Sequence, residues 1–399
     1  MDKLLELVKS TLALFIFVII YIFLGKRFKN NIPKNICQPE IMAQYLNKGG
    51  DPNARRYLGS GFYSIANCFI LMNDNPDLLK LYIAKGGELI YEYGNVMLGE
   101  RVTSPKSALI LLQYLQEKPD RFGTQRQQKI IIELLSKSKE IALLLMKNGA
   151  ELKIKDEGGN TVLHETKNRE VALLAIEYGI DVNVTDILNN TPLHSQKSLE
   201  VVQTLIAKGA NVNFKNTYGR TPLHLVKDAA IAQYLIDSGA NLTAQDNAGN
   251  SPLFLYPTAE VIQVFLKNGV DPNLKNAEGK TKLHLLATHM IHPPSRYENS
   301  IKALVDAGGY LNLQDATGKT PIHLAVTNIP PTWFKKWLYP GIDLSIIDNR
   351  GYTALDYAKM YRDEKKREFE EQNTLSSENS LKNYTEKINL LTNYNFEID

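Results

Sequence analysis

Five histidines recur along the chain at regular intervals, and regularly spaced histidines suggest a metal site. They are His164, His194, His224, His284 and His323. Imidazole nitrogen is a common zinc ligand, but all ligands of one zinc ion lie about 2 Å from the metal. Each histidine belongs to a separate copy of a repeated unit, and stacked units lie roughly a helix diameter apart, ~10 Å. The sequence therefore predicts no metal site and a structural role for these histidines.

Two Gly-Lys-Thr triplets, at 279–281 and 318–320, imitate the end of a phosphate-binding loop. That loop needs a second glycine upstream, and Leu274 and Leu313 occupy the corresponding positions. The sequence also lacks the signatures of serine hydrolases, zinc proteases and kinases. We therefore expect no catalytic residue, no cofactor and no small-molecule substrate. An enzyme with its site in 88–128 or in the 288–300 loop stays open as an alternative.

The histidines close a tetrapeptide that recurs along the chain. Two copies are identical, Thr191-Pro192-Leu193-His194 and Thr221-Pro222-Leu223-His224. Variants begin at 161, 251, 281 and 320, so the first five copies start 30 residues apart and the next interval is 39. A fixed interval in this range is typical of a solenoid, in which each repeated unit buries its apolar face against its neighbours.

Each tetrapeptide is followed by a short apolar helix and a glycine. In one unit, Thr221 can cap a helix whose first position is Pro222, where the missing N–H removes no hydrogen bond. Ile231 and Leu235 then lie four residues apart, on one face of a second helix. Gly239 ends that helix, because a left-handed C-terminal residue is most easily glycine.

A turn follows each of these glycines, and its first residue is always Asp or Asn. The fourth residue of the turn is glycine in six cases: Gly159, Gly219, Gly249, Gly279, Gly318 and Gly351. Asn189 takes that position in the seventh turn. Glycine, and less readily Asn, adopts positive φ. We therefore expect a left-handed residue at the tip of every turn.

This combination of tetrapeptide, glycine stop and turn resembles the ankyrin repeat family. The resemblance implies an all-α solenoid of helix–turn–helix units joined by β-hairpin-like fingers, with a concave groove. It further implies that the groove and fingertips bind another protein, and that the motif histidine hydrogen-bonds the backbone between neighbouring units. The expected regions are degenerate repeats or an N-terminal cap over 38–146, ankyrin repeats over 147–360, and a charged cap helix with a polar tail over 361–399. Within that tail, 381–394 is weakly amphipathic, so a short helix and a frayed end are both open there.

The chain departs from the family pattern in two places. An interval of 30 residues is shorter than the usual ankyrin repeat of about 33, so the first helices within 161–170, 191–198, 221–228 and 251–258 should be unusually short. The longer interval places extra residues at 288–296, where Pro293 and Pro294 interrupt any helix. We expect that segment to be a protruding loop.

The N-terminal segment differs from the repeats, because residues 10–25 are apolar and carry no charge. Extended to 7–25, the segment is long enough for a transmembrane helix, followed by a basic linker at 26–37. A cleaved signal peptide and a buried helix are the alternatives. The basic residues after the span place the repeats in the cytoplasm, and a count of only two cysteines fits a reducing compartment.

Binding residues are sought at the fingertips, where the repeat pattern leaves positions free. Ile187, Leu188 and Tyr218 are apolar or aromatic where a solvated turn usually carries a polar residue, although they could instead pack on the adjacent finger. The predicted partner-binding residues are Ile187, Leu188, Tyr218, Arg220, Asn247, Glu278, Lys280 and Lys319. A net charge of +3 gives no reason to expect nucleic acid binding.

The predicted function is a non-enzymatic protein–protein interaction scaffold or adaptor, tethered to a membrane by a single span. A secreted or translocated ankyrin effector of a host-associated microbe, which binds a host protein, is the alternative. Both belong to the binding class, and they differ in where the chain resides.

Overall fold

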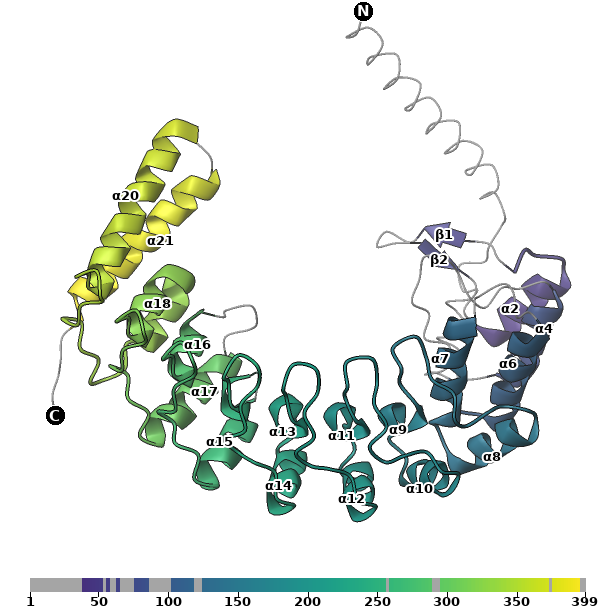
Figure 1. Cartoon of the computed structure of the whole chain (residues 1–399). Coiled ribbons are helices and arrows are strands. Elements are labelled where there is room, and N and C mark those ends of the chain that lie inside the picture. The colour runs from purple at the N-terminus through teal and green to yellow at the C-terminus, as the bar shows by residue number, and fades with distance from the viewer. Residues whose placement is uncertain are drawn as a thin grey trace, which may run out of the picture. The chain divides into compact units, whose positions relative to one another are not determined.

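The computed structural model describes residues 38–52, 55–57, 62–64, 75–85, 102–117, 124–255, 258–288, 295–372 and 375–394 (Figure 1). Two compact units make up the chain, Met1–Asp181 and Val182–Asp399. The expected transmembrane helix at 7–25 and the linker at 26–37 lie outside the described residues. Among the residues that are described, no helix is both long enough and apolar enough to cross a membrane.

The first unit is mainly helical. Its helices are α2 (Pro39–Asn47), α4 (Pro76–Ala84), α6 (Pro105–Glu117), α7 (Thr124–Leu135), α8 (Lys139–Lys147), α9 (Val162–Glu165) and α10 (Arg169–Glu177). The strands β1 (Arg55–Tyr57) and β2 (Phe62–Ser64) pair antiparallel, which adds a small sheet to the all-α prediction. Leu111, Leu115 and Leu135 are almost completely buried and contribute to the helical core.

The second unit is a helical solenoid. Its elements are α11 (Pro192–Ser195), α12 (Leu199–Ala207), α13 (Pro222–Leu225), α14 (Ala229–Asp237), η2 (Pro252–Phe254), α15 (Ala259–Lys267), α16 (Lys282–Thr288), α17 (Ser295–Asp306), α18 (Pro321–Asn328), α19 (Pro331–Phe334), η3 (Lys335–Trp337), α20 (Ala354–Gln372) and α21 (Leu375–Thr392). In Figure 1, α11 and α13 lie in one row, α12 and α14 lie in an outer row, and the fingers extend from the inner row. Buried apolar residues such as Val202, Ile231 and Phe265 fill the space between the rows.

The short first helices are confirmed. α9, α11 and α13 each have four residues, and η2 is a three-residue 3₁₀ turn. The chain leaves α13 at Val226, which is extended with ψ 138°, and Asp228 already caps the next helix by accepting from Ala230 N and Ile231 N. Where the interval is longer, α16 has seven residues and α18 has eight. The length of the interval therefore sets the length of the first helix.

The expected loop at 288–296 is shorter than the sequence suggested. Thr288 is the last residue of α16, and Ser295 is the first residue of α17, so both ends of that segment belong to helices. A proline directly before a helix is compatible with it, which explains why α17 can begin right after Pro294. Residues 289–294 lie outside the described residues.

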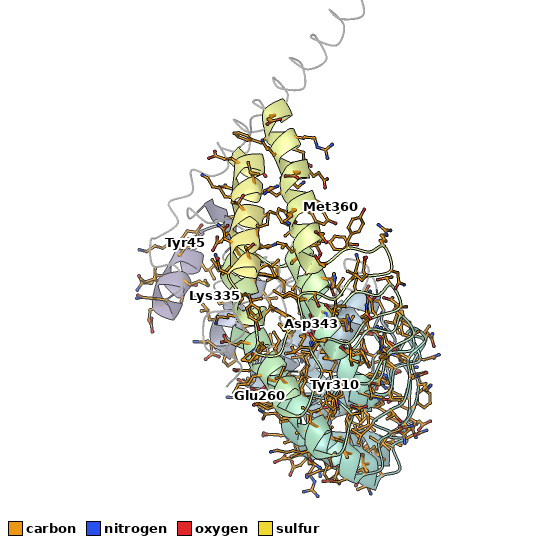
Figure 2. All side chains as sticks on the ribbon, turned by 90° about the vertical axis from the view of Figure 1, so that its left-hand side faces the viewer. Tyr45, Glu260, Tyr310, Lys335, Asp343 and Met360 are labelled. Atoms are coloured by element: carbon orange, nitrogen blue, oxygen red, sulfur yellow. The ribbon has the colours of Figure 1, made fainter. Side chains whose placement is uncertain are left out.

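The C-terminal region corrects another expectation. The charged stretch lies in α20, and residues 375–392 form a second helix, α21, where the sequence predicted a polar tail with at most a short helix over 381–394. Figure 2 shows the two helices side by side, with Met360 on α20. α21 is fixed to the solenoid because Lys387 Nζ donates to Val326 O at 2.6 Å and the Tyr384 hydroxyl donates to Thr327 O at 3.3 Å.

Candidate protein-interaction surface

The fingertips have the backbone conformation that their sequence predicts. Asn189 has φ 57°, and all six tip glycines have positive φ, for example Gly219 at 74°. Asp186 and Asn216 each stabilise their own turn through the side-chain oxygen. Asp186 Oδ1 accepts from Leu188 N at 2.8 Å, and Asn216 Oδ1 accepts from Tyr218 N at 2.9 Å. These local bonds hold each tip in one conformation.

The motif histidines have the structural role that the resemblance implied. His224 Nδ1 accepts from Thr221 N at 3.0 Å, and because an amide N–H can only donate, this nitrogen carries no proton. His224 Nε2 therefore carries the proton and donates to Asn250 O at 3.1 Å. His194, His284 and His323 make the same pair of contacts.

Burial favours the neutral form of three of these imidazoles. It is the largest cause of the lowered pKa of His224, His284 and His323, each of which has an ordinary value of 6.5. A neutral ring is what the hydrogen bonds require, since Nδ1 must accept. Within the described ranges, no three His, Cys, Asp or Glu side chains are grouped closely enough to hold a metal ion.

Backbone bonds between neighbouring fingers hold Leu188 and Tyr218 in place. Thr217 N donates to Leu188 O at 2.9 Å, and Asn247 N donates to Tyr218 O at 2.9 Å. The side chains of these two residues and of Ile187 nevertheless face solvent. Ile187 is 71% exposed, Leu188 is 39% exposed and Tyr218 is 49% exposed. The three side chains therefore form an exposed apolar patch on two successive, rigid fingers, which we name the fingertip patch (Ile187, Leu188 and Tyr218).

Arg220 borders the fingertip patch. Its Cζ lies 5.5 Å from the centroid of the Tyr218 ring, and its Nε lies 3.4 Å from Asp246 Oδ2. The Arg220 side chain is one-third exposed, so it can still receive a carboxylate from a partner. It adds a positive charge to one side of the patch.

The other predicted binding residues are engaged within the solenoid. Asn247 Nδ2 donates to Thr217 O at 3.0 Å, which joins two fingers. Lys280 and Glu278 form an ion pair at 2.5 Å. Lys319 Nζ lies 4.5 Å from the centroid of the Tyr357 ring. The structure therefore brings Ile187, Leu188, Tyr218 and Arg220 together, and it gives the remaining four residues partners of their own.

Sequence reasoning missed several exposed apolar residues, among them Tyr310 at 65%, Ile347 at 54% and Met360 at 47% exposure. Figure 2 labels Tyr310 and Met360. A comparison of equivalent repeat positions contains a signal for two of them. Tyr310 stands where other repeats have Asn211, Asn241, Asp271 and Asp343, and Ile347 stands where they have Lys215, Gln245, Lys275 and Gln314.

An aromatic row joins the last finger to the C-terminal helices. Tyr352 and Tyr357 have ring centroids 5.9 Å apart, and Tyr361 stacks on Tyr384 at 5.5 Å. The Tyr357 hydroxyl donates to Asp348 Oδ2 at 2.6 Å, and burial, together with this carboxylate, raises the pKa of Tyr357 to about 12. The row therefore stabilises the end of the solenoid.

Comparison with known proteins agrees with the repeat geometry. Residues 195–256 match the family model of ankyrin repeats (3 copies). No curated protein matches the chain. Among solved structures, the chain is similar to the crystal structure of the ankyrin repeat domain of Bcl-3, described as a unique member of the IkappaB protein family. The two sequences are 21% identical, the TM-score is 0.36, and the match covers 50% of this chain and 92% of that chain.

The chain therefore contains ankyrin repeats, which imply a role in protein–protein interaction. Of the two stretches considered for an enzymatic site, 88–128 and 288–300, the structure describes only residues 102–117, 124–128, 288 and 295–300. Residues 102–117 consist largely of α6, whose side chains Leu111 and Leu115 are buried. No observation on these residues favours catalysis.

Proposed function

We propose that the protein is a non-enzymatic adaptor that binds a protein partner through the fingertip patch and Arg220. The observation that carries the proposal is the combination of exposed apolar side chains with a fixed backbone. Tyrosine and arginine are frequent in the energetic centres of protein interfaces. A surface that is already rigid loses little conformational entropy on binding, so more of the contact energy appears as affinity.

The apolar run at 10–25 supports a membrane tether for this adaptor, with the repeats on the cytoplasmic side of the membrane. The alternative is a secreted or translocated effector that uses the same patch on a host protein. Carbonate extraction of native membranes separates the two. An integral anchor keeps the intact chain in the pellet, and its release into the supernatant would rule the anchor out.

Proximity labelling in native cells tests the binding surface. The variant Ile187→Ser/Leu188→Ser/Tyr218→Ser should lose specific neighbours that the wild-type chain labels. The matched control is Tyr310→Ser/Ile347→Ser/Met360→Ser, which removes three side chains of similar exposure from the same unit. The control should keep those neighbours. Unchanged labelling by the fingertip variant, with a wild-type circular dichroism spectrum, would place the binding surface elsewhere.

A further inference from the structure

Recurring polar links hold the second unit together, one kind inside each repeat and two kinds between successive repeats. We number the repeats I (191–220), II (221–250), III (251–280), IV (281–319) and V (320–352). The first is the histidine link, in which Nε2 of the motif histidine donates to the carbonyl oxygen that precedes the next repeat. Its members are His194 to Arg220 O at 3.0 Å, His224 to Asn250 O at 3.1 Å, His284 to Lys319 O at 3.0 Å, and His323 to Tyr352 O at 3.2 Å. Repeat III has Phe254 at this position, which cannot donate.

The second is the asparagine link, which joins the segments that follow the second helices. Asn213 Nδ2 donates to Gly239 O at 2.9 Å, and Asn213 Oδ1 accepts from Asn241 N at 2.8 Å. Asn183, Asn273 and Asn312 bridge their neighbours in the same way. Repeat II has Thr243 at this position, and its hydroxyl donates instead to Asn241 within the same turn. The asparagine link from repeat II to repeat III is therefore missing.

The third is the tip link between the backbones of adjacent fingers. It joins Thr217 N to Leu188 O, Asn247 N to Tyr218 O, Ala316 N to Glu278 O, and Asn349 N to Thr317 O. The corresponding groups of repeats II and III are Ala248 O and Ala277 N, and no such bond occurs between them in this described part of the chain. The fingers of II and III keep a single side-chain bond, from Asn276 Nδ2 to Asn250 Oδ1 at 3.1 Å.

Repeat III is also irregular inside. Its first helix is the 3₁₀ turn η2, and the following Leu255 has ψ −141°. The Ser251 hydroxyl is buried and has no hydrogen-bond partner among the described residues. The carbonyls at the end of η2 would also be orphaned, but Lys282 of repeat IV reaches back to them. Its Nζ donates to Phe254 O at 3.1 Å and to Leu255 O at 2.5 Å.

Lys282 is an unusual residue for this place. It stands at the proline position of the tetrapeptide, and its side chain is almost completely buried. A buried lysine must have hydrogen-bond acceptors to offset the loss of water, and two carbonyls at a helix C-terminus are favourable ones. The Lys282 amine thus connects η2 of repeat III to α16 of repeat IV.

We propose that repeat III is a hinge of the solenoid, which opens locally while repeats I–II and IV–V stay folded, and that Lys282 holds this hinge closed. In a repeat protein each unit contacts only its neighbours, so local stability is roughly the sum of the repeat and interface terms. Repeat III lacks the histidine link within it and the asparagine and tip links to repeat II, although Asn268 Nδ2 donates to Gln233 Oε1 at 3.0 Å across that junction. Its apolar packing through Val261, Ile262 and Phe265 is intact. Local opening then needs less free energy here than elsewhere.

Hydrogen exchange of the full chain, purified in mild detergent and followed by mass spectrometry, tests the hinge. At about 1 kcal/mol for each of three links, amides of α15 should exchange about 100-fold faster than those of α12 in repeat I, which has all three links, because 1.4 kcal/mol corresponds to tenfold. The fingers at 276–279 and 216–219 should differ in the same direction. Equal protection of α12 and α15 would overturn the hinge.

Two variants test the role of Lys282. Lys282→Met keeps the length of the side chain but removes the donor, so exchange in 251–288 should rise at least about tenfold while repeat II is unchanged. Lys267→Met, at an exposed lysine of the same repeat, is the control and should have no effect. Phe254→His restores the missing histidine link and should slow exchange in repeat III. A Lys282→Met effect that is absent, or spread evenly over 191–352, would overturn the assignment.

Discussion

Repeats II and III have the same length and much of the same geometry, yet they are held differently. Their second helices α14 and α15 both have nine residues, and Gly249 and Gly279 at their tips have φ 75° and 70°. Repeat II begins with an α-helix whose His224 bonds the last carbonyl of the same repeat, Asn250 O, whereas repeat III begins with a 3₁₀ turn and Phe254. The turn residues therefore set the backbone path, while histidine and asparagine side chains determine how firmly each repeat is attached.

The largest expected effect comes from giving repeat II the defect of repeat III. His224→Phe leaves the buried Thr221 N–H without its acceptor and Asn250 O without its donor, and each orphaned group costs about 1–3 kcal/mol. We expect the free energy of unfolding to fall by about 3 kcal/mol in urea denaturation. Phe254→His should act in the opposite direction and by less. A loss below about 1 kcal/mol for His224→Phe would contradict the importance of this link.

The second test uses pH to examine the contact between Lys282 and the end of η2 in repeat III. Burial lowers the pKa of Lys282 from 10.5 to about 7. Above pH 7 the folded chain loses this proton while the unfolded chain keeps it, so the unfolded state binds more protons and stability rises with pH. The same contribution is lost as the pH falls through 7. Between pH 7 and pH 9 we expect a gain on the order of 2 kcal/mol.

A difference measurement isolates this lysine. Urea denaturation of the wild type and of Lys282→Met is compared at each pH, and only the wild type should show the gain. This pH window lies above the one in which the histidines affect stability. Burial lowers the pKa of His224, His284 and His323 below 6.5, so their contribution to stability is lost only as the pH falls through those lower values. Parallel profiles for the two chains would show that Lys282 keeps an ordinary pKa.

The third test measures how closely adjacent fingers approach. A Cβ added at Gly219 would lie 2.9 Å from the backbone nitrogen of Asn247, whereas one at Gly249 would meet the Ala277 Cβ at 3.0 Å and its nitrogen at 3.3 Å. Both glycines have similar positive φ, so the conformational cost of alanine, about 1 kcal/mol, is shared. Gly219→Ala should therefore destabilise the chain by about 1 kcal/mol more than Gly249→Ala in thermal denaturation. Equal losses would mean that fingers I–II and II–III are equally close.

What the sequence predicted well is local. The positive φ of Asn189 follows from the chemistry of one turn, and the four-residue α13 follows from the interval between motifs. The links that distinguish repeats join residues far apart along the chain, such as Lys282 and Phe254. Their formation depends on the packing of two repeats, so a pattern of residue types within one repeat contains little information about them.

The candidate site shows the same limit. The exposed side chains of Ile187 and Tyr218 were predictable, because they interrupt a polar turn. The ion pair of Lys280 with Glu278 and the position of Lys319 over the Tyr357 ring were not, because each requires knowledge of where a flexible side chain ends. The sequence allowed only a short helix over 381–394 and not the full length of α21, since its few buried residues, such as Lys387 and Leu391, gain stability only against the preceding helices.

The smallest expected effect is the repair of the asparagine link between repeats II and III. Thr243→Asn places a carboxamide where Asn213 and Asn273 bridge to the following repeat, and the acceptor and donor it would meet are Gly269 O and Asp271 N. We expect the free energy of unfolding to rise by about 1 kcal/mol and the exchange of α15 amides to slow. Asn213→Thr is the reciprocal variant and should weaken the junction of I and II by a similar amount. If Thr243→Asn slowed exchange equally in all repeats, the gain in stability would come from the turn at Asn241 and not from the junction of repeats II and III. The difference between these two repeats would then lie in the histidine and tip links alone.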